Sequence, residues 1–179
     1  MKFFKPKVCF GFTGAEKFEV VNREYSKHIE SVSSMLDPRV IELSKLGDID
    51  DALVSKIEWL RDGRNLRLTM RCGNLQVGYY NLVLTYVNAK ISDPHKIVLS
   101  KIALGTRGQG SYDYDGALEE FDVVQNGRVA HRLLFNAIDW EHPRGNGLVW
   151  FQVVASELRW KKVPRKGRRL TGVGKRFSN

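Results

Sequence analysis

The sequence changes its hydrophobic period at Gly47, and this change limits the folds that the chain can adopt. Before Gly47, four apolar residues recur at spacings of four, three and four, as on one face of an α-helix: Tyr25, Ile29, Val32 and Leu36. After Gly47, the segment 66–72 alternates apolar with polar residues, as in a strand with one buried face. The sequence therefore predicts helices first and strands after them.

Two short helices are expected before Gly47. The first runs from about residue 23 to residue 36, with Asn22 as its N-cap, and ends at Asp37-Pro38. A proline in the first turn can begin a second helix, which we expect to continue to residue 46. Gly47 then supplies the left-handed C-cap, because glycine adopts positive φ without steric cost.

Turn sequences predict two hairpins in the rest of the chain. Asp62-Gly63 joins a strand within residues 52–61 to the strand 66–72, and Asn126-Gly127 joins residues 118–124 to 128–135 in a type I′ turn. Residues 80–87 form a further strand, whereas residues 96–104 fit either a strand or a short helix. A last strand over residues 148–160 would span about 40 Å. We therefore expect a bulge or bend near Ala155-Ser156.

The order of these elements indicates the α+β class. Strands joined by hairpins pair in antiparallel fashion, because parallel pairing would need helical crossovers. We predict two N-terminal helices packed on a mostly antiparallel sheet of five to seven strands. A length of 179 residues fits a single domain.

The net charge of +9 is concentrated at one end of the chain. Residues 1–160 carry 21 bases and 20 acids, and no acid follows residue 160. Eight cations lie in residues 161–179: Lys161, Lys162, Arg165, Lys166, Arg168, Arg169, Lys175 and Arg176. We therefore expect residues 1–160 to form a single α+β domain and residues 161–179 to form a basic, flexible tail, which is a common form of interaction arm.

Catalytic and metal-binding motifs are absent from the sequence. Cys9 and Cys72 fit neither a disulfide framework nor a zinc site, and no nucleophile elbow or zinc-protease motif is present. We expect no catalytic residue, no cofactor and no metal site. The chain also lacks a secretory signal and a stretch of 18 apolar residues, so a cytoplasmic protein without a membrane segment is expected.

His131 is the histidine with the most informative neighbours. It lies in a predicted strand, opposite the strand that carries Glu119 and Glu120 across the Asn126-Gly127 turn. A histidine beside a glutamate can act as a general acid/base pair, but such pairs more often fix strand register through a hydrogen bond. Glu120 and His131 therefore form the candidate polar pair.

Arginines and aromatic residues also occur together in the strand-rich part. Arg67, Arg71 and Arg159 are interleaved with tryptophans and with Tyr79 and Tyr80, a combination that can bind single-stranded nucleic acid. The simpler interpretation is that the aromatic residues form the core and its rim.

Several short motifs have the order seen in one group of bacterial proteins. They are Asp50-Asp51-Ala52, Tyr80-Asn81-Leu82-Val83-Leu84, Glu119-Glu120-Phe121 and His131-Arg132-Leu133-Leu134-Phe135. Over about residues 22–160 the chain resembles a set of uncharacterised bacterial proteins, some of which are grouped with candidate immunity proteins of toxin systems. The resemblance implies a non-enzymatic binding protein, and it supplies no catalytic residue.

Three functions follow from these observations. The leading expectation is a small cytoplasmic protein that binds another protein, as an immunity protein does, through an exposed sheet face or edge. The alternative is a nucleic-acid-associated protein that uses the basic C-terminal tail for phosphate contacts. An enzyme that uses Glu120 and His131 is the third possibility.

Overall fold

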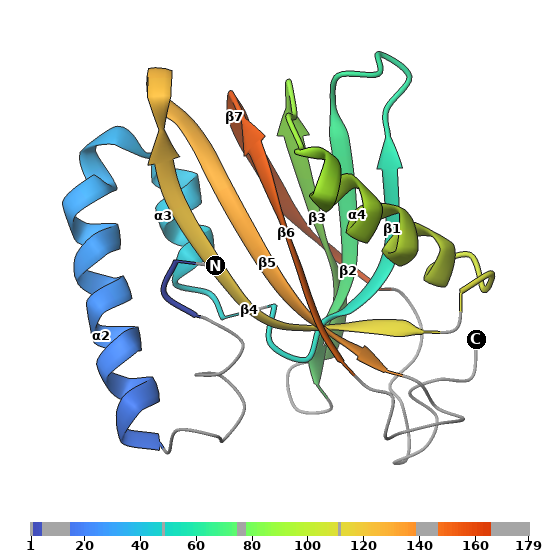
Figure 1. Ribbon diagram of the computed structural model, residues 1–179, viewed down its shortest axis with the longest axis horizontal. Helices are drawn as coiled ribbons and strands as arrows, with labels where there is room; N and C mark the ends of the chain where they lie inside the picture. Colours follow the sequence, from blue (N-terminus) through green and yellow to red (C-terminus); the bar gives the residue numbers. More distant parts are fainter. Residues whose placement is uncertain are drawn as a thin grey trace.

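The computed structural model describes residues 2–4, 15–47, 49–74, 78–110, 112–138 and 147–165. Helices precede most of the strands, as Figure 1 shows. The elements are α2 (Ala15–Val32), η1 (Ser33–Met35), α3 (Pro38–Ser44), β1 (Leu53–Trp59), β2 (Leu66–Asn74), β3 (Gly78–Val87), α4 (Asp93–Gly105), β4 (Asp113–Val124), η2 (Gln125–Gly127), β5 (Arg128–Ile138), β6 (Gly147–Ala155) and β7 (Glu157–Pro164). This arrangement confirms the predicted α+β class.

The first helix is longer than the sequence predicted. α2 begins at Ala15, so Asn22 lies inside the helix and is not its N-cap. The reason is that Phe18 and Val21 continue the apolar stripe towards the N-terminus and pack against the core. The four apolar residues that defined the predicted helix are buried, from Tyr25 to Leu36.

Local sequence signals explain how the next elements begin and end. The Asp37 carboxylate accepts a hydrogen bond from the Arg39 N–H at 2.8 Å and caps α3, and Gly47 has a φ of +60°. Residues 96–104, which fitted a helix or a strand, belong to α4, where Leu99 and Ile102 are buried.

Both predicted hairpins are confirmed. β1 pairs with β2 and β4 pairs with β5, each in antiparallel fashion. Asn126 and Gly127 have φ values of +64° and +67°, as the type I′ turn requires.

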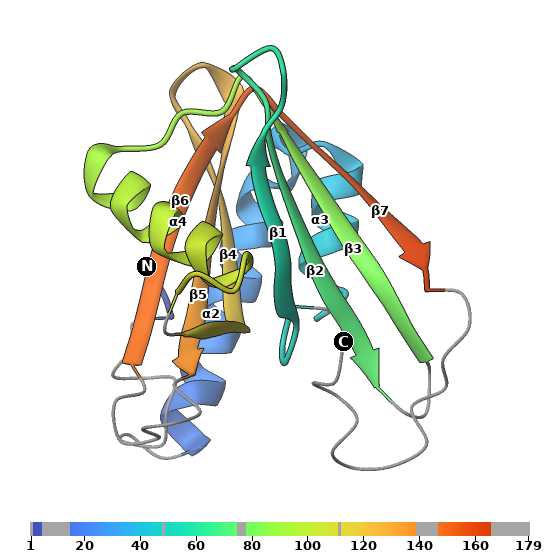
Figure 2. The same ribbon diagram turned by 90° about the vertical axis from the view of Figure 1, so that its right-hand side faces the viewer.

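The seven strands form one sheet in the order β6-β5-β4-β1-β2-β3-β7, and all pairs are antiparallel. β6 and β7 follow each other in the chain, yet they lie at opposite ends of this order. The sheet therefore folds back on itself, with one half made of β6, β5 and β4 and the other of β1, β2, β3 and β7 (Figure 2). Leu53 and Asp115 pair where β1 meets β4.

The chain turns the corner between β6 and β7 at Ser156. The Ser156 N–H and hydroxyl both donate to the Val87 carbonyl oxygen, at 3.0 and 3.1 Å. A bridge between Lys90 and Val154 holds the end of β6 beside the same segment. The bend predicted near Ala155-Ser156 is thus confirmed, and it is held by the end of β3.

The helices pack on both sides of this folded sheet. α2 and α3 lie on one side, where α2 contacts β4 and α3 contacts β4 and β7, and α4 lies on the other side against β6, β1 and β4 (Figures 1 and 2). Six inward-facing side chains of β2 and β3 are fully buried: Leu66, Leu68, Met70, Leu82, Leu84 and Tyr86. These residues form the centre of the hydrophobic core.

The end of the folded body differs from the predicted boundary. β7 continues to Pro164, and the Arg165 N–H donates to the Tyr79 carbonyl oxygen at 3.3 Å. The boundary placed after residue 160 therefore falls inside a strand, because Lys161 and Lys162 pair with Val83 and Leu82 of β3.

Gly116 supplies a test of the close contact between β4 and the segment before β1. Its N–H donates to the Ala52 carbonyl at 2.8 Å, and a Cβ at this position would collide with the Ile49 carbonyl oxygen. Gly116→Ala should lower the free energy of unfolding by about 1 to 3 kcal/mol, because backbone must move to admit the methyl group. Urea unfolding measures this change.

Gly147→Ala is the matched control, because a Cβ at Gly147 meets nothing within 4 Å. We expect its stability to stay within about 0.5 kcal/mol of the wild type. Equal stabilities for the two variants would contradict the packing described at Gly116.

Candidate functional site

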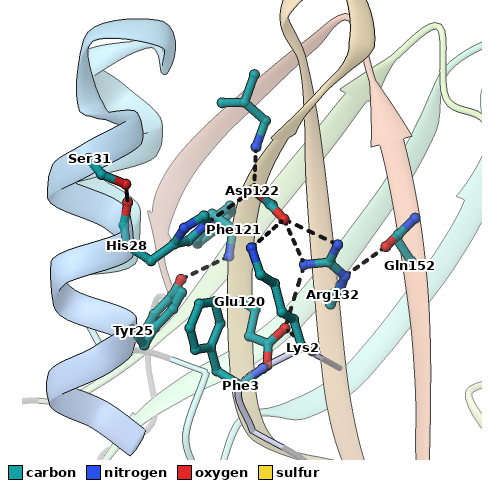
Figure 3. A network of polar contacts seen from close by, with 11 residues as sticks. Lys2, Phe3, Tyr25, His28, Ser31, Glu120, Phe121, Asp122, Arg132 and Gln152 are labelled. Atoms are coloured by element: carbon teal, nitrogen blue, oxygen red, sulfur yellow. Dashed lines mark hydrogen bonds and ion pairs between the residues drawn. The ribbon is translucent and has the colours of Figure 1, made fainter.

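Glu120 holds the N-terminal residues against β4. Its side chain is fully buried, and its carboxylate accepts hydrogen bonds from the N–H groups of Lys2, Phe3 and Phe4 at 2.8, 2.7 and 2.6 Å. Figure 3 shows Glu120 beside Lys2 and Phe3. The Arg132 guanidinium lies 3.6 Å away. A buried carboxylate is tolerated only when such donors and an opposite charge surround it. The arrangement therefore fixes the start of the chain.

A second carboxylate extends this network across three strands and α2. Asp122 lies 3.0 Å from His28 Nε2 and 3.4 Å from the Arg132 guanidinium, and Lys2 reaches it at 3.7 Å. Arg132 Nε also donates to Gln152 Oε1 on β6 at 2.7 Å. Figure 3 shows these side chains converging between α2 and the sheet. Each charged group in this network has an opposite charge beside it.

His131 belongs to a different network on the other face of β4 and β5. Its Nε2 lies 2.8 Å from Glu119 Oε2, and its Nδ1 lies 2.9 Å from the Tyr86 hydroxyl. The Phe121 ring stacks on the imidazole with ring centroids 4.1 Å apart. A neutral imidazole with hydrogen on Nε2 satisfies both bonds, since it donates to the carboxylate and accepts from the phenol.

The predicted pair of Glu120 with His131 is therefore wrong. In the observed register Glu120 lies opposite Arg132 and Phe121 lies opposite His131. Neighbouring residues of a strand point to opposite faces, so Glu119 shares a face with His131 and Glu120 does not. His131 and Tyr86 are both fully buried, which suits a structural hydrogen-bonded pair.

A third polar group lies on the half of the sheet made of β1, β2, β3 and β7. One face of these strands forms the core, and the alternate residues point away from it. Six cations occupy these alternate positions: Lys56, Arg67, Arg71, Arg159, Lys161 and Arg165. We call this surface the outer basic face. α3 packs on the opposite side, and Figure 2 views the outer side, where no described helix crosses β2, β3 or β7.

Among the described residues, carboxylates neutralise one end of the outer basic face. Glu58 pairs with Lys56 at 2.8 Å and lies 3.9 Å from Arg67. Glu157 binds Arg159 through two hydrogen bonds of 2.7 and 2.8 Å. These two acids leave the other end of the face positively charged.

Positive charge is left uncompensated at the other end, around Arg71, Lys161 and Arg165. Among the described residues, no carboxylate forms an ion pair with any of these three. Burial and the nearby charge of Arg165 lower the pKa of Arg71. Buried Arg71 Nε also has no hydrogen-bond partner within the described part of the chain. An anion at this end would supply the missing negative charge.

The eight cations predicted to form one tail divide into three groups. Lys161 and Arg165 are on the outer basic face, whereas Lys162 lies on the opposite face, where its ammonium sits 4.9 Å above the Tyr80 ring. The other five lie outside the described residues: Lys166, Arg168, Arg169, Lys175 and Arg176.

The aromatic residues are divided in a similar way. Trp160 Nε1 donates to the Arg39 carbonyl of α3 at 2.7 Å, and Trp150 packs against His95 of α4. Tyr79 lies on the outer basic face, with Arg67, Arg71 and Arg159. The three arginines named in the sequence analysis therefore lie together on one sheet face. Trp150 and Trp160 do not lie with them, because they contact α4 and α3.

No family model, curated protein or solved structure matches this chain. In the described part of the chain, no group of three or more histidine, cysteine, aspartate and glutamate side chains has the arrangement of a metal site. None of the helices that the structure describes is long and apolar enough to span a membrane.

The Glu120 network predicts a large effect of one conservative substitution. Glu120→Gln removes the negative charge and turns an amide N–H₂ towards donors, so it should lower the free energy of unfolding by about 3 kcal/mol. Glu42→Gln on the exposed side of α3 is the control, with an expected change within about 0.5 kcal/mol. Chemical unfolding of both variants checks this, and a stable Glu120→Gln protein would contradict the role of the carboxylate.

Two buried tyrosines predict a loss of stability at high pH. Burial raises the pKa of Tyr86 and of Tyr25, whose hydroxyl accepts a hydrogen bond from the Phe121 N–H at 2.8 Å. Above a pH of about 10 the unfolded chain loses these protons while the folded chain keeps them, so stability falls by about 1.4 kcal/mol per pH unit for each group.

Urea unfolding between pH 9 and pH 11.5 measures this dependence. The variant Tyr25→Phe/Tyr86→Phe lacks both titrating hydroxyls, so its stability should fall less steeply than that of the wild type. Identical slopes would show that the two phenols do not control the alkaline transition.

Proposed function

We propose that this protein binds nucleic acid through the outer basic face, with phosphate groups as the main contacts. The observation that carries the proposal is the uncompensated charge of Arg71, Lys161 and Arg165 on one sheet face. Neutralising phosphates releases condensed counterions, and this release drives binding that depends little on sequence. The basic residues after Arg165 would add further contacts of the same kind.

The alignment of the cations along β7 and the residue after it supports an extended polyanion as the ligand. Arg159 and Lys161 of β7 are two residues apart, which is about 6.6 Å along the strand, and Arg165 follows β7 four residues after Lys161, beyond the uncharged Val163. Arginine guanidinium groups match phosphate oxygens in two-pronged hydrogen bonds, whereas lysine contributes a point charge. A line of cations along one strand direction fits an extended backbone that carries repeated charges.

A protein partner is the second candidate, and it corresponds to the leading expectation from the sequence. β7 stands at one end of the strand order, so an acidic segment of another protein can add to it as a further strand. The immunity-type resemblance favours this candidate. In both cases we infer a non-enzymatic binding protein, because the two residues considered for catalysis have separate structural partners.

Charge reversal on the outer basic face tests the proposal. Lys161→Glu/Arg165→Glu should weaken binding of a fluorescent single-stranded oligonucleotide roughly tenfold at 0.15 M salt, and each lost contact should lower the salt slope by about 0.7. Lys27→Glu/Lys101→Glu is the matched control, since it changes the net charge equally at exposed positions of α2 and α4. Fluorescence anisotropy at several salt concentrations gives both quantities.

Two further binding measurements distinguish nucleic acid from an acidic protein as the ligand. One uses a variant of the basic C-terminal segment, and the other uses polyglutamate as a competitor. A full-length variant with Lys166, Arg168, Arg169, Lys175 and Arg176 changed to glutamine should bind more weakly and with a smaller salt slope, but the salt slope should not fall to zero, because the contacts of the outer basic face remain. Polyglutamate represents an acidic protein, and it should compete poorly with the oligonucleotide. Equal loss of affinity in the face variant and the control variant would contradict the proposal, and strong competition by polyglutamate would favour the protein partner.

A further inference from the structure

Tyr79 brings an aromatic ring to the uncompensated end of the outer basic face. It lies on β3 opposite Gly73 of β2, and its carbonyl accepts the Arg165 N–H on the other side. Arg71 is two residues before Gly73, so its side chain points to the same face. The Tyr79 ring is therefore placed between an arginine of β2 and an arginine that follows β7.

The side of Tyr79 towards β2 has no opposing side chain, because the opposite residue is glycine. Gly73 has a φ of +99°, and a Cβ there would collide with the Gly78 carbonyl oxygen. Only glycine fits this position without moving the hairpin. The backbone geometry therefore excludes a side chain at position 73, directly opposite Tyr79.

The two arginines around this ring carry like charges at close range. Burial and the nearby charge of Arg165 lower the pKa of Arg71, so the charged form of Arg71 is disfavoured. An anion between them would offset the positive charge of both guanidinium groups. A ring beside a bound phosphate is also the arrangement that lets the attached base stack.

We propose that the ligand of this face is single-stranded nucleic acid, with one base stacked on Tyr79 and the neighbouring phosphate held between Arg71 and Arg165. This inference rests on the proposed nucleic-acid function and specifies the form of the ligand. In a duplex both faces of each internal base are covered by its neighbours, so an aromatic side chain on a sheet has no base to stack on. Single strands expose these faces, and stacking then adds to phosphate binding with little sequence preference.

The test uses the full-length protein with three decamers: oligothymidylate, an abasic strand with the same backbone, and a duplex. Tyr79→Ala should weaken binding of oligothymidylate roughly tenfold and leave binding of the abasic strand unchanged. Tyr79→Phe should bind oligothymidylate as the wild type does, since the ring is retained. Thr85→Ala is the control for the same sheet face, with no expected change for any probe.

The outcomes distinguish this inference from the proposed function. If Tyr79→Ala binds oligothymidylate as tightly as the wild type and with the same salt slope, stacking is wrong and phosphate binding stands. Tighter binding of the duplex than of oligothymidylate would also overturn the single-strand inference. If wild-type protein binds none of the three decamers in a salt-dependent manner, both proposals fail.

Discussion

The corner at Ser156 is the constraint on which the rest of the structure depends. It joins β6 to β7, which lie at opposite ends of the strand order, so the sheet must fold back on itself. Hydrogen bonds from Ser156 to the Val87 carbonyl fix this corner beside the end of β3. The two halves then enclose the core, and Tyr86 of β3 meets His131 of β5 across it. Because one face of β2, β3 and β7 fills this core, their alternate residues must point outwards, and these include the cations proposed to bind nucleic acid.

The charged groups of this protein differ in whether the fold compensates them. Glu120 and Asp122 share Arg132, and Glu120 also accepts three backbone N–H groups. His131 lies between a carboxylate and a phenol. Buried charge is costly without such partners, so these two networks stabilise the structure. Arg71, Lys161 and Arg165 have no carboxylate partner among the described residues, and they share one sheet face. This contrast is the reason to assign a binding role to the outer basic face and a structural role to the other two networks.

Much of the fold could be predicted from local sequence signals. The Asn126-Gly127 turn, the alternation in residues 66–72 and the bend near Ser156 depend on nearby residues, and each was confirmed. The partners of Glu120 could not be predicted, because they lie at positions 2–4, more than a hundred residues away in the chain. The division of the basic segment was also missed. Its signal was that Arg159, Lys161 and Arg165 all stand at odd-numbered positions, which share one face of a strand, and the high local charge of residues 161–179 concealed it.

Nuclear magnetic resonance of the full-length, ¹⁵N-labelled protein tests the central claim most directly. A short single-stranded oligonucleotide is added stepwise, and the backbone amide shifts are followed. Phosphate binding at the outer basic face predicts the largest changes around Arg71, Tyr79, Lys161 and Arg165, with small changes in α2 and α4. Changes confined to residues after Arg165, or centred on the helices, would contradict the account, because the sheet face would then take no part in binding.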